Sequence, residues 1–469
     1  MVARKIAYNV VFSAVSKILS TALALVGIGY ITRYLGKAGF GDYATVVAFF
    51  SFFGAIADLG LYSIATREIS REKANTEKIM GNVVALRLVV SAIVFVLTPV
   101  LIVFLPYTTD VKIGISLAAL AFVFSSGYMV LNGIFQKNLA MDKVAVIELF
   151  GKIIQVSIIV TAVLKDLGFT VIVLAMVLSM VSNFLLIFFA SRKFLRFKLQ
   201  FDFEYWKKFL KMSLPMGMSV IITFLYFKMD TIILSFMQGS EDVGIYNAAY
   251  KIVENISFFP AMIVGLTLPL TSRYIFSDKR KFNKISNKTF KIFVLLTIPL
   301  VIGALFLAND MIHLIGGTDF NESVPVLRML AFALLFIFFG NFFNNILIAG
   351  NLQTKLMRTL LICAIFNIVA NLIFIPLYSY MAAAITSVIT EGLMVFLTAR
   401  LVIKELGYVP EMEGLFRFLL SGAVMAAFIF LFRDLNFFVL VLLGGVVYFV
   451  ALYFFKAISK EEILSIVRK

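Results

Sequence analysis

The chain has 469 residues, of which 62% are hydrophobic and only 14% charged, and its mean hydropathy is +1.01. Soluble domains average about half apolar and about a quarter charged residues, so this composition excludes a soluble enzyme, a disordered chain and a disulfide scaffold. The single His313 and single Cys363 exclude His-rich or Cys-rich metal sites and a disulfide within the chain. The class that remains is an all-α protein that crosses a membrane many times.

Long apolar runs recur along the whole chain, and a helix needs about 20 such residues to cross a membrane. We expect helices because the runs are too long and too uniformly apolar for the strands of a barrel. The first run is too long for a removable signal peptide and contains Lys17. The sequence predicts fourteen spans, near 9–33, 43–66, 79–105, 112–135, 144–164, 169–191, 212–236, 243–270, 289–308, 323–349, 356–376, 380–401, 414–432 and 436–456.

The formal net charge of +16 is distributed unevenly between the two sides of the predicted membrane. If the N-terminus is cytoplasmic, 31 of the 42 Lys and Arg residues lie on inward ends and loops, and five lie in outward loops: Arg33, Lys37, Lys112, Lys165 and Arg433. This positive-inside bias predicts a plasma-membrane protein with both termini in the cytoplasm. Because topology and contact with membrane lipids account for the basic loops, we expect no nucleic-acid partner.

A polar-rich loop, 192–211, separates the first six spans from the rest and has an amphipathic pattern typical of a surface helix. The sequence therefore predicts an N-lobe at 1–191, a cytoplasmic linker at 192–211 and a C-lobe at 212–404. Two extra spans and a cytoplasmic tail follow at 405–469.

An internal repeat relates the two predicted lobes. Gly36 and Gly239, Gly41 and Gly244, and Tyr43 and Tyr246 are each 203 residues apart, in the connections after spans one and seven. Glycine suits a tight turn and tyrosine suits a membrane interface. Since six spans separate the copies, the lobes have the same orientation, as in transporters that move two lobes around a central site.

Three patterns resemble those of the Wzx-type polysaccharide flippases, which belong to the multidrug/oligosaccharidyl-lipid/polysaccharide superfamily. They are R-x-L-G-x-x-x-F-G-x-Y at Arg33–Tyr43, DLGL at Asp58–Leu61, and the segment from Asp230 to Tyr246 that begins D-T-I-I-L. The resemblance covers roughly residues 1–405, and spans 13 and 14 are an addition seen in some members. It implies a transporter without enzymatic activity that moves a polyprenyl-diphosphate-linked oligosaccharide to the outer leaflet by alternating access.

Several basic residues lie inside the predicted spans, where ionisable groups are costly and default to functional candidates. Lys17 and Lys251 each lie about 12 Å from the end of their span at helix rise. Since a lipid-linked sugar carries a diphosphate, we predict that lysine and arginine line its binding site. The candidates for this substrate-binding role are Lys17, Lys251, Lys228, Arg67 and Arg87.

Ion pairing is the structural alternative for these residues, because Glu254 follows Lys251 by three positions and Lys228 is two from Asp230. For Lys152 we favour a structural pair with Glu148. Arg67 and Arg87 lie near predicted inner ends, where long side chains can extend to the interface.

Side-chain oxygens on three spans predict a coupling site for Na⁺ or H⁺. Counted at the helix rise per residue, Asp230, Asn371 and Thr386 lie about 8–9 Å from the outer ends of their spans. Asn367 shares a helix face with Asn371, and Thr390 shares one with Thr386. The pattern resembles the sodium site of peptidoglycan lipid II flippases, except that Asn371 stands where that branch tends to carry an acid. A monovalent cation is predicted at Asp230, Asn367, Asn371 and Thr386; the alternative is an interhelical hydrogen-bond cluster. Asp58 and Glu391 are further candidates for proton coupling.

Two other functions are weighed against a flippase. A multidrug or organic-cation exporter of the same superfamily should have an acidic cavity, which the membrane-depth lysines disfavour. A membrane-embedded polysaccharide polymerase or ligase needs a large outward loop with candidate bases, and the predicted outward loops are short. No cofactor is expected apart from the coupling ion, and the predicted partners are the lipid-linked glycan, membrane lipids and polysaccharide-assembly enzymes.

Overall fold

The computed structural model describes residues 2–72 and 74–457, and every regular element in these ranges is a helix. The predicted all-α membrane fold is therefore confirmed. Lys73 and most of the predicted tail, 458–469, lie outside the described residues.

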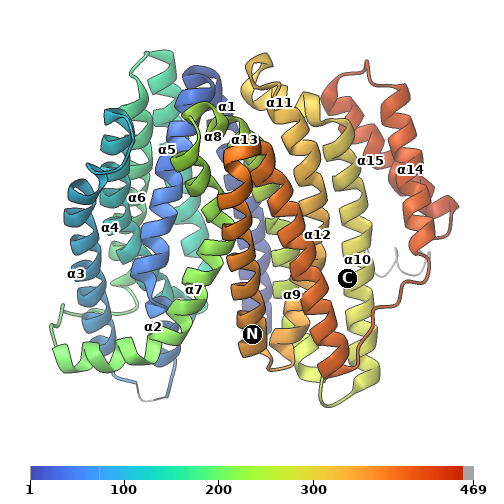
Figure 1. Ribbon diagram of the computed structural model, residues 1–469. Coiled ribbons are helices and arrows are strands. Elements are labelled where there is room, and N and C mark those ends of the chain that lie inside the picture. Colours follow the sequence, from blue (N-terminus) through green and yellow to red (C-terminus); the bar gives the residue numbers. More distant parts are fainter. Residues whose placement is uncertain (1, 73, 458–469) are drawn as a thin grey trace. The chain divides into compact units, whose positions relative to one another are not determined.

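The chain consists of two compact units, with the boundary between Asn247 and Ala248. The first contains α1 (Val2–Asp58), α2 (Leu61–Ile69), α3 (Thr76–Ile102), α4 (Thr109–Lys137), α5 (Met141–Leu164), α6 (Phe169–Ser191) and α7 (Phe203–Met237), and α8 (Ser240–Ile256) crosses the boundary. The second contains α9 (Phe258–Tyr274), α10 (Lys279–Phe306), α11 (Ala308–Gly316), η1 (Thr318–Phe320), α12 (Ser323–Ala349), α13 (Gln353–Leu406), α14 (Leu415–Leu431) and α15 (Phe437–Phe454) (Figure 1).

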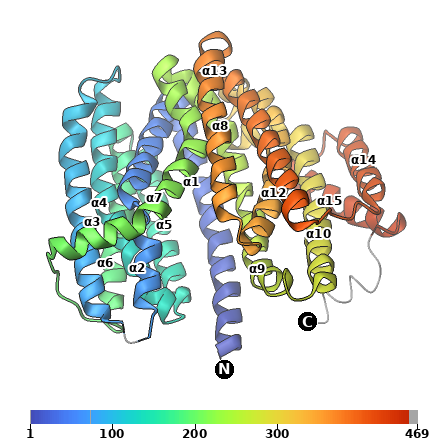
Figure 2. The same ribbon diagram turned by 60° about the horizontal axis from the view of Figure 1, so that its bottom comes forward.

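All fourteen predicted spans are present among the described residues. Eleven helices there are long and apolar enough to be candidate spans. Two of them, α1 and α13, each contain two predicted spans, because the backbone leaves helical geometry at Gly36 (φ 65°) and Ser379 (φ 47°). The shorter apolar helix α14 completes the set. Figure 2 shows the chain reversing direction within α13. The break at Ser379 falls in the predicted division at 376–380.

The predicted linker at 192–211 consists of a non-helical part and the beginning of α7, and its position along the membrane surface stays a prediction. Residues up to Asp202 are not helical but are held against the start of α3, where Asn82 exchanges hydrogen bonds of 3.1 Å with the Gln200 side chain and the Asp202 backbone. Helix α7 begins at Phe203 because the Asp202 carboxylate accepts from the Tyr205 amide. That bond, reinforced by Lys78, lowers the pKa of Asp202.

Helix α7 packs against helices of the first unit, so the boundary between the two compact units lies after α7 and not in the linker before it. Within the first unit, α7 packs on α1, α2 and α3, and its beginning lies across the direction of the neighbouring spans in Figure 1. Pro215 lies inside the helix. Whether 1–191 and 212–404 move as two lobes stays a prediction.

Candidate transport site

The two copies of the repeat contact each other directly through their glycines. A Cβ atom on Gly41 would lie 1.7 Å from the Ser240 carbonyl oxygen, and one on Gly244 would lie 2.0 Å from the Lys37 carbonyl oxygen. Lys37 and Ser240 are themselves 203 residues apart, so each copy contacts the other through equivalent atoms. Such a reciprocal contact is a local two-fold arrangement in which only hydrogen fits at either glycine.

Polar side chains surround this glycine crossing. The Lys37 ammonium lies 3.3 Å from Glu241, and the Ser240 hydroxyl donates to the Asp42 carboxylate. Both contacts join the start of the second span in α1 to the start of α8, on the side of the membrane that the charge distribution predicts as outward. The crossing and these polar contacts therefore hold the beginnings of the two helices against each other.

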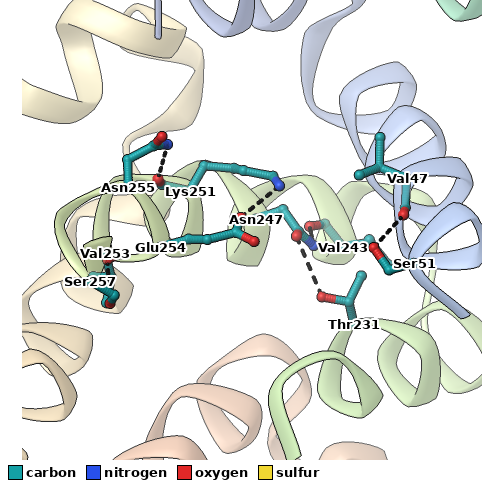
Figure 3. A network of polar contacts seen from close by, with 10 residues as sticks. All are labelled: Val47, Ser51, Thr231, Val243, Asn247, Lys251, Val253, Glu254, Asn255 and Ser257. Atoms are coloured by element: carbon teal, nitrogen blue, oxygen red, sulfur yellow. Dashed lines mark hydrogen bonds and ion pairs between the residues drawn. The ribbon is translucent and has the colours of Figure 1, made fainter. Parts of the chain in front are cut away.

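Asp230 is held by the second copy of the repeat. Its carboxylate is 4% exposed and accepts hydrogen bonds from the Tyr246 hydroxyl and, at 2.8 Å, from the Thr231 amide. Thr231 also donates to Asn247 on α8 at 3.4 Å (Figure 3). The repeat tyrosine, expected at a membrane interface, is instead a buried hydrogen-bond donor to a carboxylate.

Lys251 lies on the same helix, four residues after Asn247, in the part of α8 that belongs to the second unit. Its side chain is 16% exposed, and its ammonium lies 2.7 Å from Glu254 (Figure 3). The ion pair weighed from the spacing is therefore present. It keeps a charged lysine in a partly buried position, which is compatible with either a structural or a ligand-binding role.

The DLGL pattern forms a helix break stabilised by a buried ion pair. Leu59 and Gly60 both have positive φ, and Asp58 immediately before them pairs with Arg87 of α3. Arg87 is 1% exposed, so the expectation that it extends to the interface is wrong. Its Nε and Nη1 atoms find no hydrogen-bond acceptor among the described residues, which makes Asp58 its principal counter-charge.

The remaining basic candidates in the first unit have more open surroundings. Arg67 is 51% exposed and binds Glu68 through two nitrogens, at 2.9 and 3.1 Å, at the end of α2. Lys17 is exposed on α1, and Lys228 is partly buried on α7. Lys152 donates to Gln155 at 2.8 Å, while Glu148 accepts from Tyr128.

The amide and hydroxyl groups predicted on spans eleven and twelve come together inside the second unit. Asn371 donates to Asn367 at 3.0 Å, Asn367 donates to Thr390 at 3.3 Å, and Thr390 donates to the Thr386 carbonyl at 2.7 Å. All four are buried, and Glu391 beside Thr390 is 8% exposed. Asp230 belongs to the first unit, so its sharing of an ion with this cluster stays a prediction.

One atom in this cluster bears on cation binding. The Asn371 Oδ1 atom is buried and accepts no hydrogen bond from the described residues. Buried oxygens without partners are rare, and a monovalent cation is one group that would satisfy such an atom. No group of three or more His, Cys, Asp or Glu side chains suited to a metal occurs within the described ranges. The donor set thus consists of neutral amide and hydroxyl oxygens, which fits a hard monovalent ion better than a transition metal.

Comparison with protein-family models decides the family. The model described as "Polysaccharide biosynthesis protein" matches residues 6–275, more than half of the chain. The chain belongs to this polysaccharide biosynthesis protein family. A second model, MatE, matches 215–373 in the middle of the chain, which agrees with the superfamily expected from the sequence patterns.

Relatives of this family member include proteins named as a probable flippase and as a lipopolysaccharide biosynthesis protein. It is 27% identical to the "Probable flippase AglR" of Haloferax volcanii, but the matched region covers only 44% of each chain. It is 26% identical to the "Lipopolysaccharide biosynthesis protein WzxC" of Escherichia coli over 78% of this chain and 73% of that one. Among solved structures, "Lipid II flippase MurJ, inward closed conformation" matches 95% of this chain and 99% of that chain with a TM-score of 0.77. At 17% identity, this likeness establishes the fold.

Two features of this family member escaped sequence reasoning. The Asp58–Arg87 pair joins residues 29 positions apart, and no helical period relates them. The hydrogen bond from Tyr246 to Asp230 joins α8 to α7. The repeat itself carried a signal for the glycine crossing, because glycines at one offset in both copies are expected where the copies meet, whereas the prediction gave each copy one glycine for a tight turn and one for a helix start.

Proposed function

We propose that this chain is a flippase that moves a polyprenyl-diphosphate-linked oligosaccharide from the cytoplasmic to the outer leaflet of the plasma membrane by alternating access. In this proposal the chain is a transporter and not an enzyme, both termini are cytoplasmic, and transport is coupled to a Na⁺ or H⁺ gradient. Its partners are the lipid-linked glycan, membrane lipids and the enzymes that assemble the polysaccharide.

The glycine crossing carries the transport part of this proposal. Contact between Gly41 and Gly244 would seal the predicted outer ends of two helices with backbone atoms, next to the polar contacts of Lys37 with Glu241 and of Ser240 with Asp42. A contact of this kind can open without exposing large apolar side chains to water. Two equivalent helix ends related by a local two-fold arrangement are suited to opening outward together, which is what release to the outer leaflet requires.

The substrate class rests on charge at membrane depth and on the family. Lys17 and Lys251 would contact the diphosphate, because lysine binds phosphate as a point charge, and the partly buried ammonium of Lys251 gains most from an anionic ligand. Lys228 and Arg67 are secondary contacts in this proposal. For Lys251, the diphosphate would compete with Glu254 for the ammonium. Arg87 would orient Asp58 at the helix break and act on transport through that pair.

The ion-coupling part rests on two groups of oxygens. Asp230 is a buried carboxylate that can bind a proton or a cation, and Asn371 offers an oxygen without a partner among the described residues. Asn367, Thr386 and Thr390 would complete the cation site. Glu391 and Asp58 are the other buried carboxylates proposed to take up protons.

The test is transport by purified protein in liposomes that contain a fluorescent polyprenyl-diphosphate glycan. Native protein is compared with Lys17→Ala, Lys251→Ala and a matched control, Lys404→Ala, which removes an exposed lysine at the end of α13. We expect the first two variants to lose at least tenfold in rate, with the control unchanged, and we expect a sodium or proton gradient to accelerate the native protein.

The same preparation distinguishes a second candidate, an exporter of organic cations, which the MatE match at 215–373 favours. Extrusion of small cationic dyes, without movement of the lipid-linked glycan, would replace the flippase proposal. Equal rates of glycan-lipid transport by native protein and both lysine variants would instead support the flippase proposal but reject the two lysines as its diphosphate site.

A further inference from the structure

A basic cavity of about 790 Å³ lies within the second unit, separate from the amide cluster and from Lys251. Its walls come from the first half of α10, the segment 411–414, the start of α14 and the residues just after α15, Lys456 and Ala457. Figure 1 shows α14 and α15 side by side next to α10. The volume falls within the range of small-molecule sites, about 300–1,000 Å³.

Helix packing explains why a cavity forms here. Gly422 lets α14 approach α10 closely, since a Cβ at this position would lie 2.6 Å from the Ile298 side chain. On the N-terminal side of this contact, the space between the two helices is lined by Phe290 and Val294 of α10 and by Phe418 of α14. These side chains give the cavity an apolar floor beneath its charged rim.

The charge of the cavity is strongly positive. Two acids line it, Glu411 and Glu413. Six basic side chains also line it: Arg280, Lys284, Lys288, Lys291, Arg417 and Lys456. The four on α10 recur at helical spacing along one face of the helix. Within residues 2–72 and 74–457, the side chains of Arg280, Lys284 and Lys288 make no hydrogen bond or ion pair. The cavity therefore has positive charge available for an anion.

One oxygen in the cavity points to a ligand with hydroxyl groups. The Asn283 Oδ1 atom is buried and accepts no hydrogen bond from the described residues, although its residue lines the cavity. The neighbouring Asn287 oxygen is satisfied by Tyr408 at 2.7 Å. A ligand with an anionic phosphate and a hydroxyl donor would satisfy both the lysines and Asn283.

The surroundings favour a lipid over a soluble anion. Phe416 and Leu419, which flank Arg417 on α14, are 73% and 52% exposed, as lipid-facing residues are. The cavity also lies on the side that the charge distribution predicts as cytoplasmic, where anionic phospholipids attract basic residues. Acyl chains would lie along the apolar α14 surface while the headgroup enters the basic rim.

We propose that this cavity binds the headgroup phosphate of an anionic glycerophospholipid from the inner leaflet. Arg280, Lys284 and Lys288 contact the phosphate, and Asn283 accepts from a headgroup hydroxyl. The bound lipid fastens the extra helix pair, α14 and α15, to α10. This site is independent of the transport step.

The test measures lipid binding to the full chain in detergent by native mass spectrometry, with phosphatidylglycerol as the probe. The site variant is Arg280→Gln/Lys284→Gln/Lys288→Gln. The control variant, Arg358→Gln/Arg400→Gln/Lys404→Gln, removes three exposed charges from the same unit and the same predicted side but outside the cavity. We expect about a tenfold rise in the Kd for phosphatidylglycerol in the site variant, no more than twofold in the control, and weak binding of phosphatidylcholine to all.

Each alternative outcome overturns the proposal in a distinct way. Equal weakening in both variants would mean general attraction to a basic surface, and an unchanged Kd in the site variant would reject the cavity. Competition by glycerol phosphate as strong as that by the lipid would indicate a soluble anion. Binding of undecaprenyl diphosphate but not phosphatidylglycerol would make the cavity a waiting site for the cargo. Because no transport is measured, failure of the proposed flippase activity would leave this result unaffected.

Discussion

The helix pair around Gly41 and the helix pair around Gly244 share a backbone contact but not their chemistry. At equivalent positions, 203 residues apart, the first copy has small or apolar residues where the second is polar. Gly27, Ile28, Ala44, Ala48 and Ser51 in the first copy correspond to Asp230, Thr231, Asn247, Lys251 and Glu254 in the second. The contact is therefore a shared structural element, whereas at these five positions the polar groups, including Asp230 and Lys251, lie only in the second copy.

This difference shows how a repeat can combine symmetry with a directional task. The crossing needs the same small residue on both sides, because each glycine accommodates a carbonyl of the other copy. A buried carboxylate is costly, and duplicating it would double that cost without adding a second transported ion. The following predictions test the shared contact and the asymmetric chemistry, from the largest expected effect to the smallest.

Gly244→Ala should have the largest effect, because the added Cβ would overlap the Lys37 carbonyl. Overpacking of this kind costs about 1–3 kcal/mol, so flipping should fall by roughly tenfold or more. Labelling of Thr45→Cys, a buried position one turn after Gly41, by a membrane-impermeant maleimide should rise as the outer seal opens. Gly239→Ala is the control, since nothing lies within 4 Å of a Cβ there. Equal rates for the two variants would show that the crossing is not a seal.

Asp230→Asn should abolish acceleration by the ion gradient, about a tenfold effect, while leaving slow equilibration of the lipid across liposomes. The substitution keeps the shape of the side chain and removes its charge. Rates with and without sodium and proton gradients give the comparison, and Asp319→Asn, in the short helix η1, is a control outside the spans. Full gradient stimulation of the Asp230 variant would place coupling elsewhere.

Tyr246→Phe should destabilise the protein more than Tyr43→Phe, although the two tyrosines occupy equivalent positions. Tyr246 donates to a buried carboxylate, a bond worth about 1.5–3 kcal/mol. At the position equivalent to Asp230, the first copy has Gly27. Thermal unfolding in detergent should show a Tm lower by a few degrees for Tyr246→Phe alone. A similar loss for both would mean that the tyrosines act by packing.

Lys37→Ser makes the first copy resemble the second, which has Ser240, and should have the smallest effect. The pair with Glu241 is partly exposed, with side chains 19% and 62% accessible, and solvent screens such pairs. Flipping should change by no more than about twofold. A tenfold loss would show that the polar contact, and not the glycine backbone contact, holds the outer ends together.

Much of the architecture could be predicted because it depends on local properties of the chain. Fourteen apolar runs gave fourteen spans, and the break near Ser379 fell in the predicted division. The linker was only partly predicted, because Asp202 caps a helix at a point where the apolar pattern had not yet begun. For the site, the amides on spans eleven and twelve were expected on shared faces, and they do join through hydrogen bonds.

The sequence by itself determined the number of spans, the class of protein and the existence of a repeat, because length, hydropathy and spacing are properties of contiguous residues. Only the tertiary structure decided which groups meet. It paired Asp58 with Arg87 and Tyr246 with Asp230, and it placed Gly41 against Gly244. It also gathered basic residues from α10, from α14 and from the segment after α15 around one cavity. Such contacts depend on how helices distant in the chain pack, and the helical period of each one does not contain that information.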